Sequence, residues 1–467
     1  MPQATPLDDA PDLCRLSAAD LVQRYADRSL SPVEATRAAL DRAGQVQARF
    51  NAFSHLDIAA ALAAARESEA RWQRGEPRGK LDGVPTTIKD IVWVRGWTVR
   101  YGSRAAPGVR AEEDAPAVAL LREAGAVLLG LTTTPEFGWK ALTDSALTGI
   151  TRNPWNAART SGGSSGGAAV AAACGAGVLH LGTDGGGSIR IPAAFCGVVG
   201  HKPTFGRVPA YPASPFGTVA HLGPITRSVA DAALMLQVMS GRDLRDWYQS
   251  PWPLPPVTPL APRDLRGLRI GVWDTPPRGE VAPDVRLAFI AVLDRLEQAG
   301  AVLAPVTLPG GDLWELFRLH WYSGAAARLR GVPAAAHDLV EAGLREVAAE
   351  GERLTAAELM QAQAARAAFG GAFERMLAAH DVLVSPAVAL TAFAVGEEVP
   401  PGSGLGRWTE WAGFSYPVNL AQAPATVVPC GFGADGLPIG LQVVGRRGDD
   451  AGVLAAAAAL QTAIAPS

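Results

Sequence analysis

Capping signals mark the starts of several predicted helices along this chain. Three stretches place a serine or threonine three residues before an acidic side chain: Ser17 with Asp20, Ser31 with Glu34 (and Pro32 between them), and Thr355 with Glu358. This spacing allows the hydroxyl group and the carboxylate to bond reciprocally with the first backbone N–H groups of a helix. We therefore predict helices after these three positions, and further helices over the alanine-rich residues 56–71, over residues 283–299 and through most of residues 337–380.

Short apolar runs between these helices predict buried strands. The clearest are "VPTTIK", which ends at Lys89, residues 126–131 after the stop at Gly125, "GVLHLGT", "LRIGVW", "AVLAPVTL" and "DVLVSPAV". Near the end, "ATVVPCGFGADGLPIGLQVVG" predicts a hairpin that turns at Asp435-Gly436. Wholly apolar strands that alternate with helices are typical of α/β proteins with both sheet faces covered. We predict one large α/β domain with a central, mostly parallel or mixed, twisted sheet, interrupted by a proline-rich connector at residues 251–263.

Composition excludes several classes of protein. Hydrophobic residues make up 48% of the 467 residues, charged residues 19%, and the net charge is −3. These values are typical of a globular chain, and no basic stripe indicates binding to nucleic acid or to a membrane surface. The four cysteines are far apart and no metal-ligand spacing occurs, so we expect neither a metal nor an organic cofactor. The N-terminus lacks an apolar signal core, and we expect a cytoplasmic protein.

Two glycine-rich segments carry serines in unusual positions. The first, "SGGSSGGAAVAAACGAG", continues into an alanine-rich helical stretch, which argues against a flexible linker. The second, "GTDGGGSIRIP", places Ser188 directly after three glycines, and neither segment has the pattern of a phosphate-binding loop. The backbone N–H groups of Gly185, Gly186, Gly187 and Ser188 can form a nest for a developing oxyanion. Ser188 would then be the attacking hydroxyl group.

The base that accepts the proton of Ser188 is not evident from these segments. None of the seven histidines lies in a motif that marks a catalytic base; His180 lies in an apolar run, and His201 is the nearest candidate. Lys89 ends an apolar strand, where an ordinary solvent-exposed lysine is one interpretation. A base is the other interpretation, and it requires burial or neighbouring positive charge to lower the pKa of the amine.

The two glycine-rich segments, together with "LDGVPTTIKD" and "FCGVVGHKPTFGRV", closely resemble the amidase signature family in order and spacing. Weaker similarity extends over nearly the whole chain. The resemblance implies one domain over residues 1–467, with a helical part at 1–75, a signature core at about 76–245 and a more variable outer part at about 246–467. Near the site, Gly185 fills the variable slot of the pattern, His201 replaces a commoner apolar residue and Ser161 replaces a frequent proline; none of the three is a triad position.

The resemblance implies a Ser–Ser–Lys triad. Ser188 corresponds to the nucleophile, Ser164 to the bridging serine, which carries a cis peptide bond in the family, and Lys89 to the base. Three further residues match positions that support the site: Ser165, Asp184 and Arg190. Ser188 would pass its proton through Ser164 to neutral Lys89, attack an amide carbonyl and form an acyl-enzyme, which water then hydrolyses.

Hydrolysis of a small, non-peptide amide to a carboxylate and ammonia or an amine is the expected activity. One alternative is the glutaminase subunit of a tRNA-dependent amidotransferase, and another is a binding protein that keeps the fold without the chemistry. The expected partner is the small-molecule substrate, with a homodimer as an option. The acyl pocket is expected among residues 137–142, 211–216 and 408–416, with an apolar or aromatic lining from Phe137, Trp139, Trp408, Trp411 and Phe414.

Overall fold

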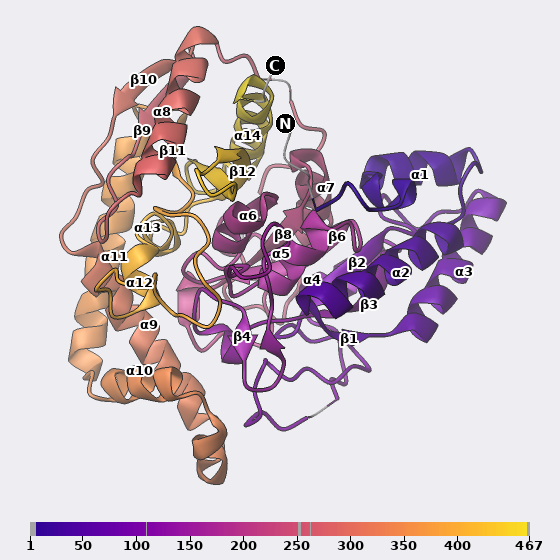
Figure 1. Ribbon diagram of the computed structural model, residues 1–467, viewed down its shortest axis with the longest axis horizontal. Helices are drawn as coiled ribbons and strands as arrows, with labels where there is room; N and C mark the ends of the chain where they lie inside the picture. The colour runs from indigo at the N-terminus through magenta and orange to yellow at the C-terminus, as the bar shows by residue number, and fades with distance from the viewer. Residues whose placement is uncertain (1–5, 109, 251–253, 262, 465–467) are drawn as a thin grey trace.

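A mixed sheet of eleven strands organises the computed structural model, which describes residues 6–108, 110–250, 254–261 and 263–464. Its first six strands, in spatial order, are β1 (Phe53–Leu56), β3 (Val127–Thr132), β2 (Pro85–Lys89), β6 (Leu179–Asp184), β8 (His221–Thr226) and β7 (Val199–Lys202). The sheet continues through β12 (Ala425–Phe432), β13 (Pro438–Val444), β11 (Val382–Pro386), β9 (Arg269–Val272) and β10 (Val302–Pro305). The two halves of the chain therefore contribute adjacent halves of one sheet, joined where β7 pairs with β12. Figure 1 shows this division between the indigo-to-magenta and the orange-to-yellow segments.

The sheet combines both strand directions. Within the described residues, β2 runs parallel to β3 and β6, and β9 runs parallel to β10 and β11. The other six pairings in the sheet are antiparallel. Two short strands, β4 (Asp144–Ser145) and β5 (Gly149–Ile150), form a separate pair. Of the two arrangements predicted from sequence, the mixed sheet is the one found.

Helices cover both faces of the sheet. The helices of the first half are α1 (Ala18–Ala26), α2 (Pro32–Phe50), α3 (Ile58–Arg74), α4 (Pro116–Glu123), α5 (Gly166–Ala173), α6 (Arg190–Cys196) and α7 (Val229–Met239). Alternate residues of β3 point to opposite faces of the sheet. Leu128 packs in a cluster with α4 and α7, whereas Val127 and Leu129 pack against α2 and α3. Helices α5 and α6 pack together in a third cluster with part of α2. The predicted two-sided cover is confirmed.

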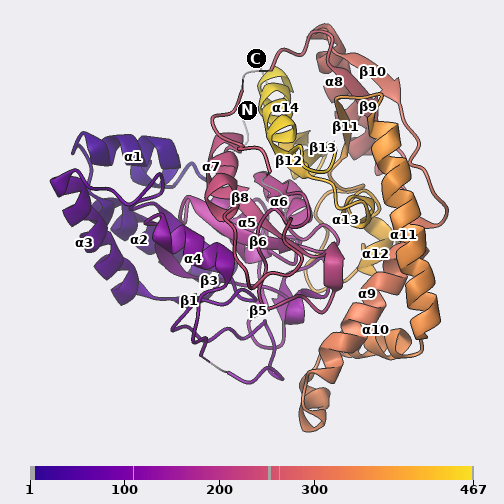
Figure 2. The ribbon, with the colours of Figure 1, turned by 180° about the vertical axis from the view of Figure 1, so that it is seen from behind.

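The second half adds an outer group of helices. They are α8 (Pro283–Gln298), α9 (Leu313–Arg330), α10 (Ala342–Glu352), α11 (Ala356–Leu377), α12 (Trp408–Trp411), α13 (Tyr416–Leu420) and α14 (Asp450–Ile464). Figure 2, which views the ribbon from behind, shows α9 and α11 along the outer edge of this half. Helices α9 to α13 enclose an aromatic-rich cluster that also includes Phe137 and Phe195 of the first half. This cluster joins the outer helices to the signature core.

Local signals in the sequence predicted several elements correctly. The capping boxes at Ser17, Ser31 and Thr355 all form, and they begin α1, α2 and α11. The last predicted hairpin is β12–β13, which turns through Asp435 and Gly436. Part of the predicted proline-rich connector, residues 251–253 and 262, lies outside the described residues, and residues 254–261 contain no helix or strand.

A substitution in helix α5 would test how closely the core around the first glycine-rich segment is packed. A Cβ atom at Gly167 would lie 2.4 Å from the carbonyl oxygen of Ala52 and 2.5 Å from the backbone nitrogen of Thr133. Gly167→Ala should therefore lower the free energy of unfolding by about 1–3 kcal/mol, although alanine favours helices. Gly44→Ala is the matched control in helix α2, where nothing lies within 4 Å of the added atom. It should raise the free energy by about 0.5–1 kcal/mol in urea titrations; equal effects of the two substitutions would contradict this account.

Candidate active site

The site lies at the carboxyl ends of two adjacent parallel strands. Lys89 is the last residue of β2, and Thr183 lies next to the end of β6. The two strands pair in parallel, with Ile88 opposite Leu181. Both strands therefore direct their final residues to the same edge of the sheet, where α/β proteins commonly place their sites.

The amine of Lys89 is enclosed by hydroxyl groups. Its Nζ atom lies 2.6 Å from Oγ of Ser164, 2.9 Å from Oγ of Ser165 and 2.9 Å from Oγ1 of Thr183. The lysine side chain is fully buried, and no carboxylate forms an ion pair with it among the described residues. An ammonium ion in such a place carries a large desolvation cost that no opposite charge in contact offsets.

Burial therefore lowers the pKa of Lys89 well below its ordinary value. The charge of Asp184 opposes this shift, but Arg190 already occupies that carboxylate. A neutral lysine amine has a lone pair and can accept a proton from a neighbouring hydroxyl group. The solvent-exposed interpretation of Lys89 is excluded by its burial.

The first glycine-rich segment holds its two serines between β6 and α5. The peptide bond between Gly163 and Ser164 is cis, as the family resemblance implied. Ser165 donates from Oγ to the carbonyl oxygen of Thr183 at 3.1 Å, and its N–H donates to the carbonyl oxygen of Ser188 at 3.1 Å. Ser165 thus connects Lys89, strand β6 and the second glycine-rich segment.

The second glycine-rich segment leaves three backbone N–H groups available. In the described part of the chain, the N–H groups of Gly185, Gly186 and Ser188 have no protein acceptor. The N–H of Gly187 differs, because it donates to Oδ1 of Asp184 at 2.8 Å. Gly187 has a φ of +121°, which favours glycine, and a Cβ atom there would lie 2.6 Å from Ile191. The segment therefore leaves the N–H groups of Gly185, Gly186 and Ser188 without an acceptor from the described residues, rather than all four predicted N–H groups.

A buried ion pair fixes the shape of this segment. Arg190 binds Asp184 through two nitrogens, each 2.9 Å from a carboxylate oxygen, and both side chains are fully buried. Burial alone would raise the pKa of Asp184, but the charge and hydrogen bonds of Arg190 outweigh it and hold that pKa below its usual range. Asn419 donates to the same carboxylate at 2.9 Å, and Gln442 accepts from Arg190 at 2.7 Å. The second half of the chain thereby braces a loop of the first half.

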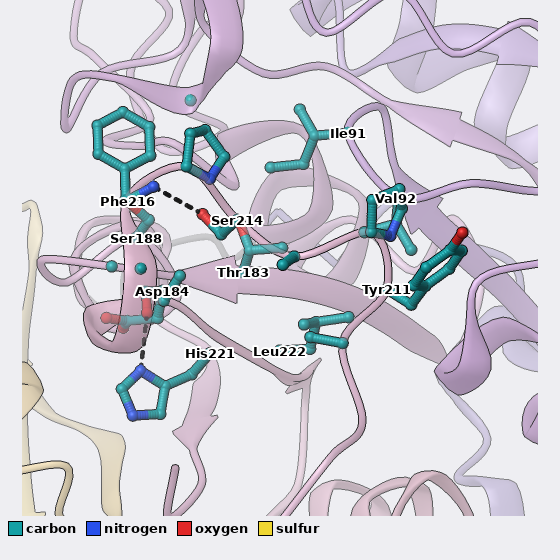
Figure 3. Close-up of a pocket in the computed structure, with 18 of the residues that line it drawn as sticks. Ile91, Val92, Thr183, Asp184, Ser188, Tyr211, Ser214, Phe216, His221 and Leu222 are labelled. Atoms are coloured by element: carbon teal, nitrogen blue, oxygen red, sulfur yellow. Dashed lines mark hydrogen bonds between the residues drawn. The ribbon is translucent and has the colours of Figure 1, made fainter. Parts of the chain in front are cut away.

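A cavity of about 450 Å³ opens onto these groups. Its polar part includes Ser164, Thr183, Asp184, Gly185 and Ser188. Its remaining walls are mainly aromatic and aliphatic, and they include Trp93, Tyr101, Phe137, Phe205, Tyr211, Phe216, Tyr248, Trp321, Ile91, Val92 and Leu222. In Figure 3, Ser188 and Phe216 lie at one end of the view and Tyr211 and Val92 at the other. The cavity can therefore hold a largely apolar molecule with one polar group near Ser188.

The residues predicted for the pocket are divided between its wall and the core behind it. Phe137 lines the cavity, and so does the whole of the segment 211–216. Trp139, Trp408, Trp411 and Phe414 are buried and do not line the cavity. Trp408 packs directly behind the glycine loop, since a Cβ atom at Gly186 would lie 2.9 Å from its ring.

The histidines considered as bases have other bonding partners. His201 contacts Thr426 at 2.8 Å and Asp450 at 3.2 Å, and His180 contacts Thr87 at 2.8 Å. His221 does line the cavity, and its Nδ1 lies 3.2 Å from the carbonyl oxygen of Asp184 (Figure 3). Burial lowers the pKa of all three rings.

Sequence reasoning missed several residues that complete the site. Thr183 lies in the second glycine-rich segment next to Asp184, and this position is the signal that could have identified its hydroxyl group as a partner of Lys89. Asn419 and Gln442 are more than 220 residues from Arg190, and no local pattern connects them. Arg328 lines the cavity from the end of α9, and the sequence alone gave no reason to select it.

Neither a metal cluster nor a membrane-spanning helix occurs in the described ranges. No group of three or more His, Cys, Asp or Glu side chains in these residues is placed to hold a metal ion. Within the same residues, no helix has the length and apolar character needed to cross a bilayer.

The fold and the sequence have counterparts among proteins named as amidases and acylamidases. A solved structure of a bacterial aryl acylamidase of the amidase signature family superposes with a TM-score of 0.89 and 29% identity, covering 96% of each chain. An acylamidase of Rhodococcus erythropolis is 37% identical over 458 residues, 95% of this chain and 94% of the relative. A component of the glutamyl-tRNA(Gln) amidotransferase of Chloroflexus aggregans is 36% identical over 457 residues, 91% of each chain.

A family model described as Amidase matches residues 34–454. The chain belongs to this family, the amidase signature enzymes, and it is an amide-hydrolysing enzyme. The resemblance stated from the sequence motifs is confirmed.

Loss of Arg190 should be costly, because it would leave the Asp184 carboxylate buried without a cation. We expect Arg190→Met to lower the free energy of unfolding by about 3–5 kcal/mol, measured by urea denaturation. Arg266→Met provides the control, since Arg266 and Asp264 form an ion pair whose side chains are 82% and 59% exposed. That substitution should change the free energy by about 1 kcal/mol or less. A mild effect of Arg190→Met would mean that the pair does not hold the loop.

Proposed function

We propose that this enzyme hydrolyses a small amide through an acyl-enzyme on Ser188, with Ser164 and Lys89 as the proton relay. The observation that carries the proposal is the 2.6 Å contact between the buried Lys89 amine and the Ser164 hydroxyl group, at the floor of the cavity that Ser188 lines. In the proposal, Lys89 is a base of lowered pKa, Ser164 is the connecting hydroxyl group and Ser188 is the nucleophile.

The proposed reaction has two steps. Ser188 Oγ attacks the amide carbon while its proton passes to Ser164 and the proton of Ser164 passes to Lys89. The N–H groups of Gly185, Gly186 and Ser188 are the available donors for the oxyanion, which such donors stabilise most strongly in the transition state. Protonated Lys89 then returns a proton through Ser164 to the leaving nitrogen as the C–N bond breaks. Water attacks the acyl-enzyme by the same relay and releases the carboxylate.

The cavity favours a substrate with an apolar or aromatic body. Aromatic rings from separate parts of the chain surround the space beyond Ser188, including Phe137, Phe216 and Trp321. Such walls bind apolar surface by removing it from water. An acylamide or anilide suits this space, and the names of two similar proteins, an acylamidase and an aryl acylamidase, agree with that choice.

A glutaminase component of a tRNA-dependent amidotransferase is the second candidate. The 36% identity to a glutamyl-tRNA(Gln) amidotransferase component over 91% of the chain favours it. Ammonia release from glutamine that appears only when partner proteins are added would support this candidate. Turnover of anilides by the isolated chain, with no activity on glutamine, would support the first.

Ser188→Ala should reduce amide hydrolysis to background, because no other hydroxyl group in the proposal can form the acyl-enzyme. The measurement is release of nitroaniline from an acyl 4-nitroanilide, with circular dichroism to show that the fold is retained. A fluorophosphonate should label the unmodified enzyme and fail to label the variant. Equal labelling of both proteins would exclude Ser188 as the nucleophile, and no labelling or turnover of either would favour a binding protein.

The pH dependence should reflect the proton on Lys89. The amine acts as a base only when neutral, and burial lowers its pKa well below the ordinary value of about 10.5, so activity should fall as the pH drops through this lowered pKa, at a lower pH than an ordinary lysine would give. Lys89→Ala should reduce kcat/KM by roughly 100- to 10,000-fold and remove this acidic limb. Lys80→Ala, at an exposed position, is the control and should leave the profile unchanged. Activity that increases towards acid pH would contradict a lysine base.

A further inference from the structure

Arg328 places a positive charge in the wall of the cavity. It lies in the last turn of α9 and lines the same cavity as Ser164 and Ser188. Its Nε atom is buried and has no hydrogen-bond partner, and the described residues provide no carboxylate within ion-pair distance of its guanidinium group. Burial lowers the pKa of Arg328, and Tyr101 opposes this shift.

The four arginines that are buried within the described residues have acceptors, and for Arg366 these are the carbonyl oxygens of Leu420 and Asn419 rather than a carboxylate. Arg190 binds Asp184, Arg42 binds Asp9, and Arg207 contacts Asp450. A buried charge is costly unless an opposite charge or hydrogen bonds compensate it. The nearby Arg330, also in the last turn of α9, is mostly exposed and lies 3.4 Å from Glu352. Both arginines lie in the last turn of α9, yet only Arg330 has a carboxylate partner among the described residues. The position of Arg328 in the helix therefore does not account for its lack of such a partner.

Two aromatic rings hold the guanidinium group in place. Its Cζ atom lies 5.5 Å from the ring centre of Tyr101 and 5.2 Å from that of Phe137. Both rings line the cavity as well, and the N–H of Phe137 donates to the carbonyl oxygen of Tyr101 at 2.7 Å. Stacking uses the faces of the guanidinium plane and leaves its edge, with five N–H donors, for other acceptors. That edge matches the two oxygens of a carboxylate.

The acidic residues of the cavity wall are already engaged. Asp184 is bound by Arg190, and Asp246 accepts hydrogen bonds from the backbone N–H groups of Ala210 and Tyr248 at 2.8 Å each. Neither is within ion-pair distance of Arg328. A molecule in the cavity can therefore supply an acceptor to the terminal nitrogens of Arg328, for which the described residues provide no carboxylate.

We infer that Arg328 selects amide substrates that also carry a carboxylate, which it binds while the amide group lies at Ser188. The inference rests on the proposed function and extends it to a substrate class: an apolar or aromatic amide with an acid group away from the bond that is cleaved. The acid group belongs either to the acyl part or to the amine part, and the experiment distinguishes the two.

The test uses two matched pairs of substrates. Glutaryl 4-nitroanilide and valeryl 4-nitroanilide differ by a carboxylate on the acyl part, and N-valeryl-4-aminobenzoate and valeryl 4-methylanilide differ by one on the amine part. The unmodified enzyme should show a higher kcat/KM for the acid of at least one pair. In Arg328→Met, the ratio of acid to neutral substrate in that pair should fall by roughly 10- to 100-fold, the range expected for a charge-assisted hydrogen-bonded pair. Arg328→Lys should recover part of the ratio, because it keeps the charge and loses the planar fork.

Arg330→Gln is the control on the same helix and should leave both ratios unchanged. A preference for neither acid in the unmodified enzyme would overturn the inference, and so would acid-to-neutral ratios in Arg328→Met that stay within roughly threefold of those of the unmodified enzyme.

A binding measurement distinguishes failure of this inference from failure of the proposed chemistry. In Ser188→Ala protein, calorimetry should show that glutaryl 4-nitroanilide or N-valeryl-4-aminobenzoate binds roughly tenfold or more weakly when Arg328→Met is added. This result requires no turnover, and equal affinity for both acids with and without Arg328 would again overturn the inference.

Discussion

The burial of the Lys89 amine among three hydroxyl groups is the constraint on which the rest of the site depends. An amine in this position is unfavourable as a cation, because it loses hydration and gains no contact with a carboxylate of the described residues. The neighbouring negative charge, on Asp184, is taken by Arg190. The structure thus keeps the Asp184–Arg190 ion pair apart from the Lys89 amine, although the strands that end at Asp184 and Lys89, β6 and β2, are neighbours in the sheet.

That separation requires residues from both halves of the chain. Asp184 and Arg190 belong to the second glycine-rich segment, whereas Asn419 and Gln442 bond to them from α13 and β13, near the other end of the sequence. The joint between the two halves of the sheet, at β7 and β12, brings these segments together. The continuous sheet therefore brings residues of the second half into contact with a loop of the first half.

The cavity combines this rigid polar floor with walls that remove apolar surface from water. Its aromatic side chains come from the segments around residues 93, 101, 137, 205, 211–216, 248 and 321, most of which lie outside the glycine-rich motifs. The hydroxyl groups around Lys89 and the aromatic wall of the cavity are consequently supplied by different parts of the chain. The glycine-rich motifs hold Ser164 and Ser188, and most of the wall comes from other segments of the first half, together with Trp321 and Arg328 of α9.

The sequence by itself determined the class of fold, the family and the three capping boxes, and through the family resemblance it selected Lys89, Ser164 and Ser188. The caps depend on local spacing, because a cap needs a hydroxyl group three residues before a carboxylate. Lys89 and Ser164 are 75 residues apart, so it is the resemblance of their motifs to the family pattern that connects them. The sequence also suggested Trp139, Trp408, Trp411 and Phe414 for the pocket, because it shows which side chains are aromatic but not which way they face.

Only the tertiary structure decided three further matters. It placed the Lys89 side chain in the interior, whereas the sequence left open whether this lysine is buried or exposed to solvent. It assigned the N–H of Gly187 to Asp184, so that three N–H groups of the loop remain available instead of four. It also turned Arg328 towards the cavity and its neighbour Arg330 towards solvent. Each of these results depends on contacts between segments far apart in the chain, and the free energy of such contacts is set by burial and partners rather than by spacing along the sequence.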